Sequence, residues 1–370
     1  MIKILQVRNV DSFVESRRQK TSEKDRKIVQ AILNDVRKNG DSAVKKYERK
    51  FNGKGEFAQV NLRVDIWEKR RVRRKITEAQ RDALRSSARR LDDVQLRLKK
   101  GLIGSVKNLP GVSFIPISSV GCYVPGGQAR YPSSAIMSAF TALAAGVKRI
   151  VITTPPGPDG TVDPLTLLVA GWCEAEIYKV GGAQAIGALA YGTKTIPRVD
   201  KIVGPGGKFV SIAKSLVSDQ TAIDMIAGPT ELGIIADASS DPELVALDLI
   251  SQAEHSKDTM CFVITQSKTM AKQIQKSIEK LILGVERSSI VKESISKNGF
   301  IAVCKNENEV IELANKIAPE HLELMVGNAK TLSKKITGAG LLLIGKNTPS
   351  AASDYILGTN HILPTNGFGR

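Results

Sequence analysis

The sequence contains few of the side chains on which cysteine-based, histidine-rich or base-stacking sites depend. Its 370 residues include three histidines and four cysteines, and aromatic residues make up only 5% of the chain. The cysteines are Cys122, Cys173, Cys261 and Cys304, which are far apart and form no C-x-x-C pair. This spacing does not support a cysteine zinc site, and a chain of this length is not expected to need a disulfide scaffold. We therefore interpret the cysteines as small buried hydrophobic residues.

The sequence also lacks long hydrophobic runs. No apolar stretch approaches the roughly 20 residues that a membrane-spanning helix needs. The first segment, "MIKILQVRNVDSF", becomes polar too early for a secretory signal peptide. Hydrophobic residues at 42% and charged residues at 25% are typical of soluble globular proteins, and the length allows two domains or one large α/β unit. We therefore expect a cytoplasmic protein with no membrane partner.

Positive charge is in excess, because 54 lysines and arginines stand against 37 acidic residues, for a net charge of +17. The densest basic run, "EKRRVRRK" at residues 68–75, falls on an expected helix. Such a surface would attract nucleic acid, an acidic membrane or an anionic cofactor. However, the basic residues are spread over the expected helices, and aromatic side chains that could stack on bases are scarce. We therefore predict a solvated basic face and no nucleic-acid partner.

The apolar pattern predicts an α/β fold. Residues 22–101 have helical spacing, including a long charged helix expected from about 66 to 100. From about residue 112, apolar strands such as "KRIVITTP" and "LGIIAD" alternate with small-residue helices such as "PSSAIMSAFTALAAG". This alternation is typical of parallel sheets covered on both faces, and it returns near the end of the chain. We predict two α/β domains of similar plan, preceded by an N-terminal helical segment.

An adjacent acid and histidine, Glu320 and His321, stand between a helix that ends near Ile317 and an alternating strand, "HLELMV". A helix-to-strand junction can aim neighbouring side chains into one cleft, whereas successive residues of a regular strand point to opposite faces. Imidazole can act as a base near neutral pH, and a carboxylate can activate water. Taken alone, the pair is also compatible with a structural role.

The other two histidines have comparable surroundings. Gln252 and His255 lie one turn apart on an expected helix, so an amide oxygen and an imidazole nitrogen can approach one metal ion. Asp354 and His361 flank a loop rich in Gly, Asn and Pro, where functional side chains are often displayed. Each residue by itself is compatible with packing or a helix surface. Because every histidine stands close to an acid or an amide, we infer one shared site to which Asp354 contributes a carboxylate and His361 a substrate contact.

The segment "GPGGKFVSIAK", residues 204–214, follows an expected strand and precedes an expected helix, as a phosphate-binding turn does. It does not fit G-x-G-x-x-G, because Phe209 occupies the position of the third glycine. A close-packed strand–helix turn and a phosphate contact therefore both remain open for this segment.

Together these segments resemble the histidinol dehydrogenase family over nearly the whole chain. The resemblance rests on nine segments in order: "ILNDVRKNGDSAVKKYERKF", "GCYVPGG", "YPSSAIMSAFTALAAGVKRIV", "VGGAQAIGALAYGT", "KIVGPGG", "IDMIAGPTELGIIAD", "SQAEH", "IAPEHLEL" and "SDYILGTNHILPT". It implies a zinc-dependent, four-electron oxidation of L-histidinol through histidinal to L-histidine, with two NAD reduced in turn. It also implies a homodimer of two incomplete Rossmann-like domains, the second inserted into the first. We expect an arm at 1–20, a first domain of 21–122 with 231–370, and a second domain at 123–230.

The resemblance assigns roles to individual residues. By this similarity, His321 is the general base of the oxidations and Glu320 activates the water that hydrates the aldehyde. By matches to family positions, the implied zinc ligands are Gln252, His255 and Asp354. The implied substrate contacts are Thr230 and His361. The implied NAD contacts are Tyr123, Gln184 and Gly207.

The chain departs from the family pattern at three places. Family members usually have asparagine at the position of Gly207 and serine at the position of Thr230, and the first change puts NAD affinity in doubt. They also continue beyond "LPTNGFGR" with a tail that brings a histidine to the partner's zinc and a glutamate to its substrate. The alternative to an active enzyme is therefore a truncated or divergent paralogue that binds NAD or histidinol with little turnover.

Overall fold

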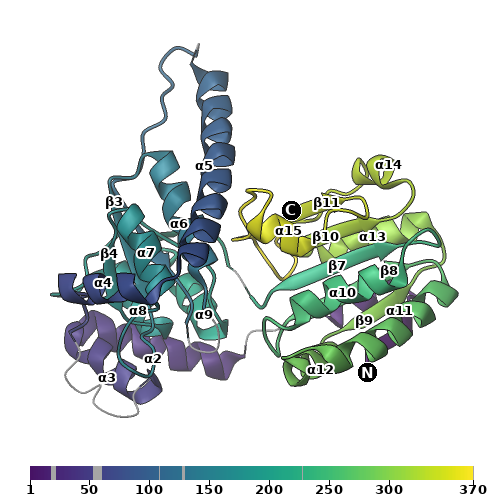
Figure 1. Ribbon diagram of the computed structural model, residues 1–370, viewed down its shortest axis with the longest axis horizontal. Coiled ribbons are helices and arrows are strands. Elements are labelled where there is room, and N and C mark those ends of the chain that lie inside the picture. The colour runs from purple at the N-terminus through teal and green to yellow at the C-terminus, as the bar shows by residue number, and fades with distance from the viewer. Residues whose placement is uncertain (18–21, 53–60, 108, 127–129, 227, 370) are drawn as a thin grey trace. The chain divides into compact units, whose positions relative to one another are not determined.

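The computed structural model describes residues 1–17, 22–52, 61–107, 109–126, 130–226 and 228–369 (Figure 1). Residues 127–129 of the predicted glycine-rich turn lie outside this set. The chain forms two compact units. The first unit comprises Met1–Lys20, Ala227–Asp354 and Leu363–Arg370, and the second comprises Thr21–Ile226 and Tyr355–Ile362.

The first unit contains a six-stranded sheet with the order β1-β9-β8-β7-β10-β11, in which all pairings are parallel. Its strands are β1 (Lys3–Gln6), β7 (Glu231–Ala236), β8 (Met260–Thr265), β9 (Phe300–Val303), β10 (His321–Met325) and β11 (Leu341–Ile344). Its helices are α1 (Val10–Glu15), α10 (Pro242–Ala253), α11 (Lys268–Leu281), η3 (Ile282–Gly284), α12 (Ser288–Lys297), α13 (Glu307–Ile317), α14 (Ala329–Ser333) and α15 (Ser350–Tyr355).

Helices cover both faces of this sheet, as expected for buried parallel strands (Figure 1). One face packs against α10, α11 and α12 through a core that includes Leu232 and Ile234. The opposite face packs against α1 and α13 through a core that includes Phe262, Leu322 and Leu324. Because side chains alternate along a strand, His321 and Glu323 of β10 point toward the α10 face.

The second unit contains a five-stranded parallel sheet with the order β4-β3-β2-β5-β6. Its strands are β2 (Ser119–Tyr123), β3 (Arg149–Thr154), β4 (Glu176–Lys179), β5 (Lys201–Val203) and β6 (Ala222–Ile223). Its helices are α2 (Glu23–Asn39), α3 (Asp41–Asn52), α4 (Ile66–Val72), η2 (Arg73–Lys75), α5 (Glu78–Val106), α6 (Pro132–Ala145), α7 (Pro164–Trp172), α8 (Gly182–Tyr191) and α9 (Lys208–Val217).

Two cores also flank this second sheet. Helices α2, α3, α8 and α9 pack in one of them, and α5, α6 and α7 pack in the other (Figure 1). The predicted α/β class with two parallel-sheet domains and N-terminal helices is confirmed. The segment 1–20, predicted as an arm, contributes β1, which is the edge strand beside β9.

The grouping of the chain differs from the predicted boundaries at residues 21–122. These residues were expected with 231–370, but they group with 123–226. The reason is packing, because α2 and α3 contact α8, and α5 makes extensive contacts with α6. The single charged helix expected from about 66 to 100 is instead divided into α4 and α5, because Thr77 and Gln80 form a capping box that starts α5.

Within the part of the chain that the structure describes, none of the helices combines the length and apolar character needed to span a membrane.

Candidate active site

The predicted pair Glu320–His321 lies at the junction between α13 and β10. Helix α13 ends in a left-handed residue, Ala318, whose φ is +46° and whose N–H donates to Ala314 O at 2.9 Å. This conformation turns the chain away from the helix, and β10 begins three residues later at His321. The prediction that a helix-to-strand junction carries these two side chains is confirmed.

The imidazole of His321 lies between two carboxylates. Its Nδ1 is 3.9 Å from Glu320 Oε2, and its Nε2 is 3.9 Å from Asp354 Oδ1. The three side chains are 2%, 9% and 7% exposed, so their charges interact in a medium far less polar than water. Carboxyl groups beside both ring nitrogens can stabilise a positive charge on the ring, so this imidazole is placed to accept a proton from a substrate.

Glu320 is held by the backbone of the neighbouring strand. Glu231 N–H donates to Glu320 Oε2 at 3.1 Å, which fixes one of the two carboxylate oxygens. Burial raises the pKa of Glu320 well above its usual range, and although the Glu231 hydrogen bond lowers it, the charges of Glu231 and Asp354 raise it further. A carboxylate with a raised pKa accepts a proton from water more readily near neutral pH.

Asp354 and Gln252 are linked by the start of α15. Ser350, the first residue of this helix, donates its backbone N–H to Glu323 Oε1 at 2.6 Å. Its hydroxyl lies 3.4 Å from the amide oxygen of Gln252, and Asp354 follows one turn later in α15. Burial raises the pKa of Glu323 and of its neighbour Asp248, which identifies them as a pair of carboxyl groups that favours holding a proton. This frame fixes the positions of Gln252 and Asp354 relative to β10.

The remaining two predicted residues of the first unit flank this frame. His255 follows the end of α10, and its N–H donates to Gln252 O at 3.2 Å. Thr230 directly precedes β7, and its carbonyl oxygen accepts from Met260 N at 3.0 Å. The structure therefore places Thr230, Gln252, His255, Glu320, His321 and Asp354 in the same unit.

The donor set of Gln252, His255 and Asp354 fits zinc by its chemistry. It offers an amide oxygen, an imidazole nitrogen and a carboxylate oxygen, and two of its members are joined through Ser350. Across the described ranges, no group of three or more His, Cys, Asp or Glu side chains is placed to hold a metal ion. The predicted zinc set contains only two side chains of these types, His255 and Asp354, because Gln252 offers an amide.

These residues lie at the amino edge of the first sheet. Glu231, Met260 and His321 begin β7, β8 and β10, which are neighbouring parallel strands in register. Helix α10 connects β7 to β8 and runs back across the sheet, so Gln252 near its end returns to the same edge. Ligands of doubly wound sheets usually bind at the carboxyl edge. The candidate site therefore lies at the opposite edge from the one that the fold class alone predicts.

The predicted NAD residues belong to the second unit. Tyr123 ends β2, and its hydroxyl accepts from Gly182 N at 3.1 Å, while burial raises its pKa to about 12. Gln184 is almost fully buried, and its Nε2 donates to Glu48 Oε1 at 2.7 Å. Gly207 is the N-cap of α9, with an ordinary φ of −66° and open space where a Cβ would stand.

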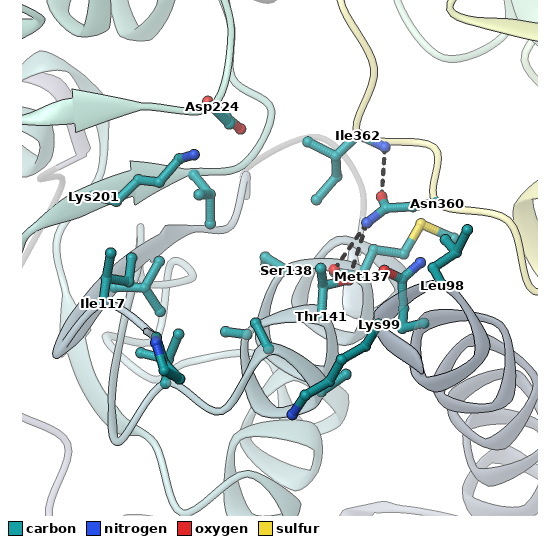
Figure 2. A pocket seen from close by; sticks show the side chains of 18 of the residues that line it. Leu98, Lys99, Ile117, Met137, Ser138, Thr141, Lys201, Asp224, Asn360 and Ile362 are labelled. Carbon is teal, nitrogen blue, oxygen red and sulfur yellow. Dashed lines mark hydrogen bonds between the residues drawn. The ribbon is translucent and has the colours of Figure 1, made fainter. Parts of the chain in front are cut away.

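His361 also belongs to the second unit, where α6 holds its backbone. Its N–H lies 3.2 Å from the sulfur of Met137, and the neighbouring Asn360 donates to Met137 O at 3.2 Å and Thr141 Oγ1 at 3.1 Å. Figure 2 shows the hydrogen bonds of Asn360 at one side of a groove of about 910 Å³. The groove is largely apolar and is lined by α5, residues 114–117, α6 and β5. None of the predicted catalytic, zinc or NAD residues is among its described lining residues.

Sequence reasoning missed Glu231, Glu323 and Ser350. Glu231 and Glu323 are buried acids inside otherwise apolar strands, and each is about 1–3% exposed. An ionisable residue at a fully buried strand position is unusual unless it is paired. That signal was present in "ELGIIAD" and "HLELM", whereas the contribution of Ser350 through its backbone N–H leaves no mark in the sequence.

Comparisons with known proteins agree with the motif pattern. A sequence profile described as histidinol dehydrogenase matches residues 15–370. A histidinol dehydrogenase of Methanosarcina barkeri is 41% identical over 355 residues, which cover 93% of this chain and 80% of the relative. That of Bacillus subtilis is 40% identical over 359 residues, covering 94% and 82%. The crystal structure of the Elizabethkingia anophelis enzyme has a TM-score of 0.87 at 31% identity and covers all of this chain and 86% of that one.

Proposed function

Because the chain belongs to the histidinol dehydrogenase family, we propose that it oxidises L-histidinol through histidinal to L-histidine, with NAD accepting both hydrides. Family membership makes the chain an oxidoreductase of histidine biosynthesis. The observation that carries the finer proposal is the buried imidazole of His321 between Glu320 and Asp354.

In the first oxidation, His321 accepts the hydroxyl proton of the alcohol while the carbon loses a hydride. The two neighbouring carboxylates stabilise the resulting imidazolium, since opposite charges at 3.9 Å interact strongly at a buried site. The product of this step is the aldehyde.

Glu320 serves the second oxidation by activating water. Its carboxylate accepts a proton from a water molecule whose oxygen forms a bond to the aldehyde carbon, while the imidazolium of His321 returns its proton to the carbonyl oxygen to give the hydrate. His321 then accepts a hydroxyl proton of the hydrate while the carbon loses its second hydride, which leaves the carboxyl group of histidine. The raised pKa of Glu320 suits it to the water-activating step.

Substrate and metal contacts complete the proposal. Gln252, His255 and Asp354 would hold zinc, which supplies Lewis-acid binding of the substrate's imidazole and amino groups rather than redox chemistry. Thr230 and His361 would contact the substrate. Tyr123, Gln184 and Gly207 would contact NAD.

We further propose that the protein is a cytoplasmic homodimer. Support comes from large apolar side chains of the second unit that are exposed, among them Leu98, Leu102, Phe114 and Ile115, which lie along the groove of Figure 2. Exposed apolar patches of this kind usually mark association surfaces.

Separate assays of the two oxidations test the assignments. We expect Glu320→Gln to slow histidinal oxidation by about 100-fold or more, and histidinol oxidation much less, because only the former needs activated water. His321→Asn should suppress both steps, because each requires a proton acceptor. Stopped-flow NADH formation from histidinol and from histidinal separates the two. Equal losses for both substrates in Glu320→Gln would contradict this division of labour.

A further inference from the structure

A buried carboxyl group that the proposed chemistry does not use lies next to Glu320. It belongs to Glu231, the first residue of β7, which is 3% exposed. Its Oε1 accepts from Asn366 N at 3.0 Å, and among the described residues its Oε2 has no hydrogen-bond partner. Burial raises the pKa of Glu231 to about 7. A buried acid so poorly compensated costs stability, which calls for a functional reason.

Glu231 connects Glu320 with the segment Thr365–Gly369. The backbone N–H of Glu231 donates to Glu320 Oε2, and its side chain receives Asn366 N–H. The same segment accepts Gly228 N–H at the hydroxyl of Thr365 and donates Gly369 N–H to Ala318 O at 3.3 Å. It therefore contacts both the strand that holds Glu320 and the turn that carries it.

We propose that Glu231 is a positioning residue for Glu320. Its backbone N–H fixes one oxygen of the Glu320 carboxylate, and its buried side chain places a like charge nearby that makes Glu320 the stronger base toward water. The proposal rests on the water-activating role of Glu320.

The charged groups around this pair come from three parts of the chain. Glu320 and His321 lie at the start of β10, and Asp354 lies on α15. Arg17, which follows α1, lines a small cavity of about 20 Å³ together with Glu231. Its guanidinium lies over the rings of Phe13 and Phe300, at 5.3 and 5.2 Å from their centroids. The charges of Glu231 and Asp354 act on Glu320, and the backbone N–H of Glu231 also holds Glu320 by a hydrogen bond.

The Glu231→Gln variant separates the effect of the Glu231 charge from that of the hydrogen bonds that Glu231 makes. Glutamine keeps an oxygen for Asn366 N–H and leaves the backbone N–H in place, but it removes the charge. We expect the acid limb of the pH profile for histidinal oxidation to move to lower pH by about one unit, because a like charge has been removed. Histidinal oxidation above that limb should slow several-fold, about 3–10-fold, since the base is weaker. The rate of histidinol oxidation should change less than about twofold, because that step does not need water activated by Glu320.

Matched variants make the result decisive. Glu231→Asp keeps the charge and should restore most of the wild-type pH limb, and Glu279→Gln, an exposed change in α11, should leave both steps unaltered. Thermal unfolding of every variant shows which of them are folded. If Glu231→Gln does not fold, the pH profile of Glu231→Asp still tests the role of the charge.

The outcomes for this inference and for the proposed function are distinguishable. If Glu320→Gln blocks the histidinal step while Glu231→Gln leaves its rate and pH limb unchanged, the role of Glu231 is refuted and the proposed function stands. If Glu320→Gln leaves the histidinal step intact, the proposed function fails, and this inference fails with it.

Discussion

At the scale of single residues, the site is built from acids that are costly to bury. Glu231, Glu320, Glu323 and Asp354 are all buried, and two of them, Glu320 and Asp354, flank the imidazole of His321. In this chain with a net charge of +17, burial raises the pKa of Glu231 to about 7 and also raises the pKa of Glu320 and of Glu323. Buried carboxyl groups keep their protons more strongly, and they are suited to proton transfer and metal binding.

The zinc assignment makes a prediction at this scale. His255→Asn should lower zinc affinity by at least about 10-fold, because removal of a direct ligand costs no less than loss of an outer-shell partner. Zinc content after dialysis against a weak chelator measures this without any assay of activity. His361→Asn is the matched control, since His361 is not a proposed ligand. Equal zinc content in the His255 variant and the wild type would remove His255 from the set.

At the scale of elements, the turn between β5 and α9 combines three glycines, two of which are constrained by close neighbours and one of which is not. Gly204 has a φ of +111°, and a Cβ there would come 2.2 Å from Tyr123 O. Gly206 faces Val210 so closely that a Cβ would clash with its side chain. These contacts favour the close-packed turn over a phosphate site. Gly207, in contrast, needs no glycine, because its φ is ordinary and its Cβ position is open.

This difference between Gly207 and Gly204 predicts how substitutions at the two positions behave. Gly207→Asn should change stability by only a few tenths of a kcal/mol, because asparagine is a good N-cap residue. If the family's amide contacts NAD at this position, the variant should bind NAD more tightly. Gly204→Ala is the control and should destabilise by more than about 1 kcal/mol, because alanine is strained at positive φ. Calorimetric NAD titration and thermal unfolding give both answers, and an unchanged NAD affinity in Gly207→Asn would reject the contact.

The elements themselves were largely predictable, because apolar periodicity is local. The parallel strands and the helix-to-strand junction at Glu320 follow from patterns a few residues long. The break at Thr77 was missed, although "TEAQ" contains a capping box, because the charged pattern continues on both sides of it. The location of the site at the amino edge was not predictable, since it depends on how α10 and α15 return to β10.

At the scale of the whole molecule, the sequence did not reveal how distant segments group. Residues 21–122 join 123–226 because α2 packs on α8 and α5 packs on α6, and these contacts involve separations that no local pattern encodes. The link from Asn366 through Glu231 to Glu320 spans more than a hundred residues for the same reason. Motif resemblance identified residues with roles, but not the residues that hold them.

The central claim is that one site performs two successive oxidations. The most direct measurement is the amount of NADH formed per L-histidinol consumed by this chain with added zinc, with the products identified by chromatography. The account predicts two NADH for each histidinol and L-histidine as the product. One NADH with accumulation of histidinal, or no NADH from a folded and zinc-loaded protein, would contradict it.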